Sequence, residues 1–209
     1  MKVVKFGGSS VADAGQFQKV KAIINQDPQR QIVVISAAGK YGDATRKLTD
    51  TLYLIADGLE AGRDVTPLFA QVTARLEAIN QVLHLHVPLI KLMNTIRHHI
   101  ATHYSRDYLV SRGEFLTAHL MAAYLGYTFV DAADLLFFDQ NGTIDEAKTL
   151  AAYRRLPRHH GIVVPGFYGQ NAAGHVQLMA RGGSDISGAW LARLAQADLY
   201  ENWTDVSGI

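Results

Sequence analysis

The stretch that decides the fold lies at the amino terminus, where residues 2–6 (KVVKF) are followed by Gly7 and Gly8 in the segment KFGGSS. A short apolar run of this kind is typical of a buried strand, and paired glycines end it. Apolar residues at positions 17, 20 and 24 then share one helical face, with Asp13 as the expected N-cap. Strand, glycine turn and helix together predict the repeating unit of a parallel α/β sheet.

The rest of the chain continues this alternation. Residues 31–36 (QIVVIS) and 161–165 (GIVVP) are rich in β-branched side chains, as parallel strands covered on both faces are. Further strands are predicted at 127–131 and 199–203, and hairpins at 135–142 and 166–178. Helices are predicted at 47–62, 67–82, 88–104, 112–125 and 184–196. Most of this helical sequence falls between the second and third strands.

Composition restricts the class of protein. The 209 residues allow one large α/β domain or a domain that has been cut short. A hydrophobic share of 48% and a charged share of 19% are ordinary for a soluble globular fold. A net charge of +1 indicates neither a nucleic-acid nor a membrane partner. With no signal peptide and no membrane-spanning run, we expect a cytoplasmic protein.

Several common catalytic and nucleotide motifs are missing from the sequence. There is no GxxxxGK[ST] phosphate loop, no GxGxxG fingerprint and no HRD or DFG element. Gly39 and Lys40 resemble part of a phosphate loop, but Tyr41 stands where a serine or threonine would bind magnesium. Cysteine is absent, and the nine histidines lack the spacing of a helical zinc site, so no protein-held metal is predicted.

The turn after the first strand is a candidate anion site. Lys5 stands at the carboxyl end of the strand, directly before Gly7 and Gly8. A cation beside bare backbone N–H groups and a helix N-terminus suits phosphate. The alternative is a tight strand–helix turn that happens to follow a lysine.

A second pair of glycines opens a later helix. Gly182 and Gly183 follow Arg181, and their lack of side chains allows a close approach to a ligand. Ser184 or Asp185 could simply cap the helix, which is the alternative. Two such turns facing one another could hold the donor and acceptor ends of a phosphoryl transfer.

Polar residues at two other element ends are weaker candidates. Glu114 stands at the predicted start of the helix 112–125, where the helix dipole alone would favour a carboxylate. Thr204 and Asp205 follow the strand 199–203, where ligand-contacting residues collect, although a plain turn would explain them equally well.

Taken together and in order, these segments resemble the aspartate kinases of the amino acid kinase superfamily. The matching segments are KFGGSS at the start, SRGE (111–114), PGFYG (165–169), RGGSD (181–185) and WTDVSG (203–208). RGGSD with WTDVSG favours aspartate kinases over acetylglutamate, glutamate, carbamate or uridylate kinases. The resemblance spans the whole chain. It implies a three-layer αβα sandwich with a mainly parallel central sheet and a helical insertion after the second strand.

The resemblance also implies roles for individual residues. Lys5 would balance charge on the transferring phosphoryl group, and Asp185 would orient that lysine or the metal–phosphate array. Arg181 would pair with a substrate carboxylate and Glu114 with its ammonium group. The implied ATP-binding residues are Lys5, Gly7, Gly8, Ser9, Thr204 and Asp205. The implied substrate-binding residues are Ser36, Thr49, Glu114, Phe167, Arg181 and Ser184.

The implied reaction is phosphorylation of the side-chain carboxylate of L-aspartate by ATP with Mg²⁺, giving 4-phospho-L-aspartate on the way to lysine, threonine and methionine. That carboxylate has an ordinary pKa of about 3.9 and is already a competent nucleophile at neutral pH, so no general base is required. Two alternatives remain open. One is a kinase for another carboxylate, such as glutamate or acetylglutamate, and the other is a fragment that binds ligand without turnover.

The resemblance further implies that residues 1–209 are a kinase domain incomplete at its C-terminus. Regulatory ACT domains, present in the family, would be absent, and the full-length protein would be a homo-oligomer. A strand that leads into a loop at 204–209 is a poor place for a domain to stop, so we expect the natural protein to continue beyond Ile209. The sequence departs from the family at Ala180, where glycine is common, and at Ser9, where threonine is common.

Overall fold

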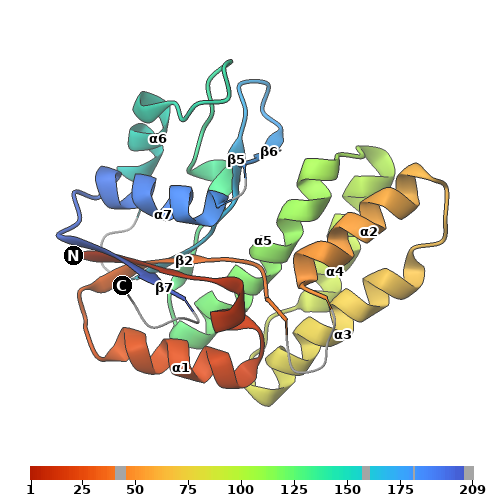
Figure 1. Ribbon diagram of the computed structural model, residues 1–209, viewed down its shortest axis with the longest axis horizontal. Helices are drawn as coiled ribbons and strands as arrows, with labels where there is room; N and C mark the ends of the chain where they lie inside the picture. Colours follow the sequence, from red (N-terminus) through yellow and green to blue (C-terminus); the bar gives the residue numbers. More distant parts are fainter. Residues whose placement is uncertain (41–45, 157–160, 181, 205–209) are drawn as a thin grey trace.

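A computed structural model describes residues 1–40, 46–156, 161–180 and 182–204. Two predicted site residues, Arg181 and Asp205, lie outside this part of the chain. The described strands of the main sheet are β1 (Lys2–Phe6), β2 (Arg30–Ile35), β3 (Thr128–Phe129), β4 (Ile162–Pro165) and β7 (Leu199–Trp203). They run in the order β3-β4-β2-β1-β7, and every pair is parallel (Figure 1).

Helices cover both faces of this sheet. Side chains alternate along each strand, so neighbouring residues enter different cores. Val4, Val33 and Val163 pack with α1 (Ala14–Asn25) and α5 (Arg106–Leu125). Val3, Val34 and Val164 pack on the other face with α7 (Gly183–Leu194) and α6 (Glu146–Tyr153). The predicted three-layer αβα sandwich is thereby confirmed (Figure 1).

The predicted helical insertion is also present. Between β2 and β3 the chain forms α2 (Leu48–Glu60), α3 (Thr66–Val82), α4 (Leu89–Thr102) and α5, which Figure 1 shows as a block beside the sheet. α5 joins the two parts, because it packs against the sheet and also against the other three helices of the block. A buried serine, arginine and glutamate therefore lie in its interior.

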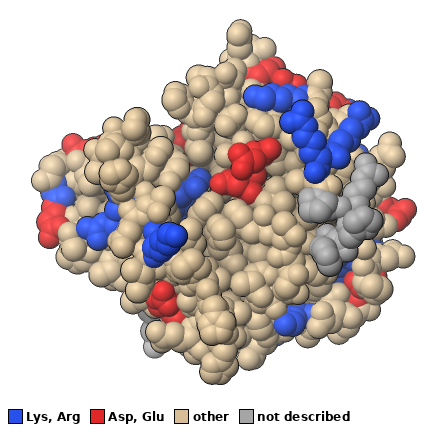
Figure 2. Space-filling view, turned by 180° about the vertical axis from the view of Figure 1, so that it is seen from behind, with Lys and Arg blue, Asp and Glu red and all other residues tan. Residues whose placement is uncertain are grey.

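Smaller elements connect the layers. Two 3-10 turns are η1 (Gly8–Val11) and η2 (Ala132–Asp134). The hairpin predicted at 166–178 is confirmed as β5 (Tyr168–Gln170) paired with β6 (Val176–Leu178). Among the described helices, none is long and apolar enough to cross a membrane. On the face shown in Figure 2, basic and acidic residues occur in separate small groups interspersed with uncharged ones.

Three sequence predictions differ from the structure. α5 begins at Arg106 rather than at residue 112, because the Ser105 side chain accepts the N–H of Tyr108 and caps the helix there. α6 was not predicted, although Asp145 caps it in the same way. The segment 135–142 forms a single antiparallel bridge, between Phe138 and Ile144, instead of a paired hairpin.

Candidate active site

The candidate site lies where the carboxyl ends of β1, β2, β4 and β7 meet. In a parallel sheet these ends share one edge, so loops that are far apart in the sequence come together there. The turn after β1, the loop after β2 and the first turn of α7 all reach this edge, and α5 passes beside it. Most of the predicted site residues belong to these segments.

Lys5 and Asp185 form the ion pair at the centre of the site. The Nζ of Lys5 lies 2.7 Å from Oδ1 of Asp185, with the Lys5 side chain 9% and the Asp185 side chain 48% exposed. The two predicted glycine turns therefore converge, as the sequence indicated. Asn202 was not a predicted site residue, yet its Nδ2 donates to the same Asp185 oxygen at 3.1 Å. The alternative that Asp185 caps α7 is wrong, since Gly182 is the N-cap and receives no side-chain bond.

Glycines allow the turn after β1 to touch the loop after β2. Gly39 donates its N–H to the Gly8 carbonyl at 2.8 Å. A Cβ added at Gly39 would lie 2.6 Å from the Gly8 carbonyl carbon, and one at Gly8 would lie 2.9 Å from the Ala37 oxygen. Backbone thus meets backbone at both positions, which leaves no room for a side chain. Ser9 lies in the same contact, within η1.

Gly7 differs from the sequence expectation. Its N–H donates to the Trp203 carbonyl at 3.2 Å, which ties the turn to the end of β7. This N–H is therefore engaged inside the protein, and donation from Gly7 to ATP would require that bond to break. The contact nevertheless places Gly7 close to the Lys5 ammonium, which a Cβ at Gly7 would approach to 3.7 Å.

Arg75 of α3 supports the loop after β2 and was missed by sequence reasoning. Its guanidinium donates to the carbonyls of Gly39 and Ala12, and more weakly to that of Arg46. Burial lowers the pKa of Arg75 from its usual value, while Asp13 acts in the opposite direction. Arg75 thus links the loop after β2 to the segment before α1 through backbone carbonyls.

The first turn of α7 packs tightly under the start of the β5–β6 hairpin. Gly182 has a φ of 85°, a conformation that favours glycine. A Cβ at Gly166 would lie 2.7 Å from the Ser184 side chain, so Ser184 is held against this turn. Phe167 also has a positive φ, of 76°. Its N–H donates to the Ser187 hydroxyl and its carbonyl accepts the Met179 N–H, and these two hydrogen bonds hold it there.

Glu114 is a buried carboxylate with spare hydrogen-bonding capacity. It lies in the interior of α5 rather than at the start of a helix, so the helix-dipole explanation of this residue is wrong. Burial raises the pKa of Glu114 to about 8, although the N–H groups of Glu114 and Ala37 and the charge of Arg112 act in the opposite direction. Its Oε2 has no hydrogen-bond partner among the described residues. A buried acceptor of this kind suits a cationic ligand group.

Aromatic rings surround the side chain of Arg112, which lies near Glu114 in α5. Its guanidinium lies 4.3, 4.4 and 5.2 Å from the ring centres of Tyr108, Phe115 and Tyr168. It also donates to the Ser111 hydroxyl at 2.8 Å. The arginine of SRGE is therefore a buried cation held by ring faces, a role that the sequence did not suggest.

The remaining predicted residues lie at the edges of the site. Ser36 directly follows β2 and donates its N–H to the Phe6 carbonyl at 3.2 Å. Thr49 lies in the first turn of α2, next to Leu48, whose N–H donates to the Ala38 carbonyl at 3.0 Å. Neither side chain makes a polar contact with the Lys5–Asp185 pair in the described structure. Thr204 follows β7 and is exposed.

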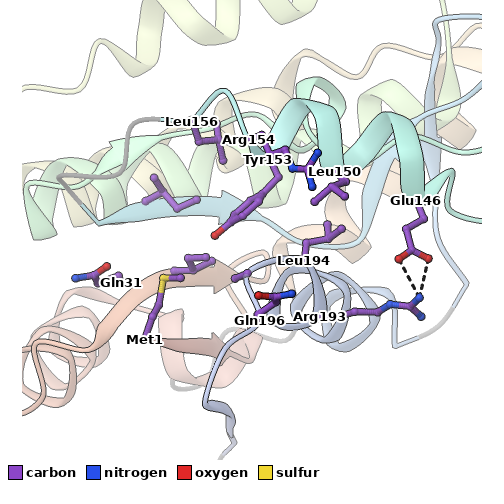
Figure 3. Close-up of a pocket in the computed structure, with 13 residues that line it drawn as sticks. Met1, Gln31, Glu146, Leu150, Tyr153, Arg154, Leu156, Arg193, Leu194 and Gln196 are labelled. Atoms are coloured by element: carbon purple, nitrogen blue, oxygen red, sulfur yellow. Dashed lines mark hydrogen bonds and ion pairs between the residues drawn. The ribbon is translucent and has the colours of Figure 1, made fainter.

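A hollow of about 600 Å³ lies at the opposite edge of the sheet, away from these residues (Figure 3). Its walls come from the starts of β1, β2 and β4 and from α6 and the end of α7. Two charged pairs lie at this edge, Arg193 with Glu146 and the amino group of Met1 with Asp198, and Arg154 also lines the hollow. Within the described ranges, no group of three or more His, Asp or Glu side chains could hold a metal.

Comparison with known proteins identifies the family. The model of the amino acid kinase family matches residues 1–209. Aspartokinase 3 of Bacillus subtilis is 37% identical, over 100% of this chain and 49% of its own length. The chain thus spans about half the length of the curated relatives that it matches.

Solved structures agree with this result. The crystal structure of Clostridium acetobutylicum aspartate kinase superimposes with a TM-score of 0.95 at 39% identity, covering 100% of this chain and 48% of that one. Escherichia coli aspartokinase III, in complex with aspartate and ADP, gives a TM-score of 0.84 at 27% identity, covering 100% of this chain and 50% of that one.

Proposed function

The chain belongs to the amino acid kinase family, and on that premise we propose that it phosphorylates the side-chain carboxylate of L-aspartate with ATP. The products would be 4-phospho-L-aspartate and ADP. The observation that carries the proposal is the buried Glu114 carboxylate, whose Oε2 has no partner in the described residues, beside the glycine-lined edge that holds Lys5. The names of the similar proteins, which are aspartate kinases, support the same substrate.

The substrate would be recognised by its two backbone charges. Its ammonium group would bond the free oxygen of Glu114 and would favour the ionised carboxylate there. Its α-carboxylate would pair with Arg181, as the family resemblance implies, although Arg181 lies outside the described residues. Ser36, Thr49, Phe167 and Ser184 would border the same pocket. Glu114 then selects an amino acid over a simple dicarboxylate.

The chemical step needs positioning and neutralisation of charge rather than a general base. A side-chain oxygen of aspartate attacks the γ-phosphorus of ATP, forming the acyl phosphate bond, while the bond from that phosphorus to the β–γ bridging oxygen breaks. Its electrons leave with ADP, so no proton is transferred. Lys5 would stabilise the charge on the transferring group, with Gly8, Ser9, Thr204 and Asp205 along the nucleotide.

Magnesium fits this arrangement as a partner of the nucleotide. Oδ2 of the half-exposed Asp185 makes no polar contact with the described residues, so it is free to face a cation. Asp185 would hold Mg²⁺ together with the nucleotide, and the metal would supply neutralisation of the phosphate charge. Asp185 therefore has one oxygen for Lys5 and one for the metal–phosphate group.

A substrate panel tests the proposal. ADP release is measured by a coupled assay with L-aspartate, L-glutamate, N-acetyl-L-glutamate and succinate, with Bacillus subtilis aspartokinase 3 as the positive control. Among these acceptors we expect turnover with aspartate only, and calorimetric binding of aspartate that Glu114→Gln weakens about 10- to 100-fold. A preference for glutamate or N-acetylglutamate would contradict the proposal, and so would equal binding of succinate.

A further inference from the structure

The register of β7 places Asn202 next to the catalytic lysine. In the parallel pair of β1 and β7, Lys5 is opposite Asn202, so both side chains leave the sheet on the face that α7 covers. There Oδ1 of Asp185 accepts from Lys5 at 2.7 Å and from Asn202 at 3.1 Å. One carboxylate oxygen thus receives both donors, and the other is left free within the described structure.

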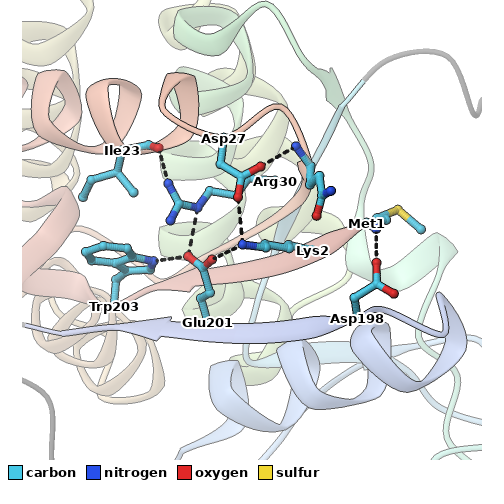
Figure 4. A network of polar contacts seen from close by, with 9 residues as sticks. Met1, Lys2, Ile23, Asp27, Arg30, Asp198, Glu201 and Trp203 are labelled. Carbon is cyan, nitrogen blue, oxygen red and sulfur yellow. Dashed lines mark hydrogen bonds and ion pairs between the residues drawn. The ribbon is translucent and has the colours of Figure 1, made fainter.

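The residues on either side of Asn202 are fixed by other contacts (Figure 4). Glu201 accepts from Arg30 at 2.9 Å and from the Trp203 indole at 2.8 Å, and lies 3.6 Å from the Lys2 ammonium. The Trp203 ring stacks on Phe6, and the backbone carbonyl of Trp203 accepts the Gly7 N–H. The backbone of Asn202 is therefore held from both sides, although its side chain is exposed.

We propose that Asn202 is a positioning residue for phosphoryl transfer, which acts by fixing the orientation of the Asp185 carboxylate. The amide keeps Oδ1 directed at Lys5 and turns Oδ2 toward the exposed side of the site. This inference rests on the proposed function of the site. An uncharged donor is required here, because a carboxylate would compete with Asp185 for Lys5 and a second cation would compete with Lys5 for Asp185.

The proposal predicts that loss of the Asn202 amide lowers kcat and leaves the KM for aspartate unchanged. Asn202 contacts the lysine–aspartate pair, whereas Glu114 is held by α5 and the loop after β2. Loss of the amide should therefore change the alignment of Lys5 during transfer without changing the recognition of aspartate. A hydrogen bond to a charged group supports an effect of about tenfold on kcat.

The first experiment compares substitutions at position 202 in the protein. Asn202→Ala is expected to lower kcat about tenfold with an unchanged KM for aspartate, and Asn202→Asp to lower it further. Leu199→Ala, on the exposed part of the same strand, is the matched control and should leave kcat unchanged. An unchanged kcat in Asn202→Ala, or an equal change in the control, would overturn the proposal.

The second experiment does not depend on turnover. The rate at which trinitrobenzenesulfonate modifies Lys5 is followed by mass spectrometry of the Lys5 peptide, since a paired amine must leave its partner before it reacts. We expect a several-fold faster rate in Asn202→Ala, and no further increase when Asn202→Ala is added to Asp185→Asn. An unchanged rate, or additive effects, would overturn the proposal even if aspartate is phosphorylated. If aspartate is not phosphorylated but the rates change as expected, only the proposed substrate fails.

Discussion

Charged side chains at the two ends of the parallel strands differ in whether their partners lie within the protein. At the amino ends of β1 and β2, Lys2 pairs with Asp27 at 2.8 Å, and Arg30 pairs at 2.9 Å with Glu201, the middle residue of β7 (Figure 4). At the carboxyl ends, within the part of the chain that the structure describes, Lys5 pairs with one half-exposed carboxylate, that of Asp185, and Glu114 keeps a buried oxygen without any partner. The residue types are alike, but Lys2, Arg30 and Glu201 have charged partners within the protein, whereas an oxygen of Glu114 has no partner in the described residues.

This difference distinguishes charged residues that matter for folding from those that can bind a ligand. When all partners of a charge are protein groups, removal of one partner destabilises the fold, and the charge has no position left for a ligand. A buried polar group with an unpaired oxygen destabilises the free protein, and it gains its missing hydrogen bond only when a ligand supplies the partner. The site therefore lies at the edge where hydrogen bonding is incomplete, whereas Arg193 and Glu146, which line the hollow at the opposite edge, are paired with each other (Figure 3).

The sharpest test compares the two lysines of β1. Lys5→Ala is expected to lower kcat by about a thousandfold, because charge on the transferring group loses its nearest cation. Lys2→Ala, the matched control at the other end of the strand, should lower the melting temperature and leave kcat within about twofold. Circular dichroism and the coupled ADP assay measure the two effects. Equal losses of kcat in both variants would remove the functional distinction between the two ends.

Glu114→Gln should produce the next largest effect. The amide keeps the shape of the side chain but offers no charge to an ammonium group, so the KM for aspartate should rise about 10- to 100-fold. Steady-state kinetics over a range of aspartate concentrations measures the change. The KM for ATP serves as the internal control and should stay constant. A KM for aspartate within twofold of the original value would exclude an ammonium contact at Glu114.

The pH dependence of stability tests the same residue without substrate. The folded pKa of Glu114, about 8, lies above its unfolded value, so the folded state binds the proton more tightly. Its contribution to stability is fully present below the unfolded pKa of about 4.5 and is lost as pH rises to about 8. Urea unfolding should therefore show Glu114→Gln gaining stability relative to the original protein, by a few kcal/mol, between pH 5 and pH 9. A difference that does not change with pH would mean that Glu114 is ionised in the free protein.

Glu201→Gln tests the paired end of the sheet. The substitution leaves Arg30, which is 12% exposed, without its counter-charge, so we expect a loss of about 2 kcal/mol in the free energy of unfolding. The denaturant midpoint measures this loss. kcat should change less than in Asn202→Ala, since Glu201 faces away from the Lys5–Asp185 pair. A larger effect on kcat than on stability would show that the two ends are coupled through β7.

The smallest effect is expected at the surface pair of Arg193 and Glu146. Their contacts are short, 2.9 and 2.7 Å, but the two side chains are 62% and 48% exposed. Solvent screening limits such a pair to less than about 1 kcal/mol. Arg193→Ala should therefore leave both unfolding and kcat nearly unchanged. A clear loss of activity would indicate that the hollow of Figure 3 takes part in function.

Local sequence was sufficient for most of the fold. β-branched runs and paired glycines predicted the strands, and the convergence of Lys5 with the first turn of α7 followed from strands ending at one edge. The start of α5 and the whole of α6 carried readable signals, Ser105 and Asp145, each capping a helix with an acid in its first turn. The prediction followed the spacing of apolar residues instead. That spacing begins later than the start of α5 and is too short in α6 to indicate a helix.

Other features of the site depend on tertiary structure alone. The Asn202–Asp185 bond requires the register of β7 on β1, and Arg75 reaches Gly39 only because α3 packs beside the loop after β2. The burial of Glu114 follows from the true length of α5, which places SRGE between the sheet and the helical block. Long-range register and helix packing of this kind leave no mark in the local sequence.

Phe167 shows what tight packing around α7 implies for the rest of the site. A non-glycine residue at a positive φ is strained by about 1–3 kcal/mol, and only its surroundings keep it there. Its N–H donates to the Ser187 hydroxyl of α7, and its carbonyl accepts from the N–H of Met179, which follows the hairpin. These two hydrogen bonds stabilise the torsion. The hairpin and α7 thus share the restraint on this backbone, so the torsion of Phe167 couples the position of the hairpin to that of the first turn of α7, which carries Asp185.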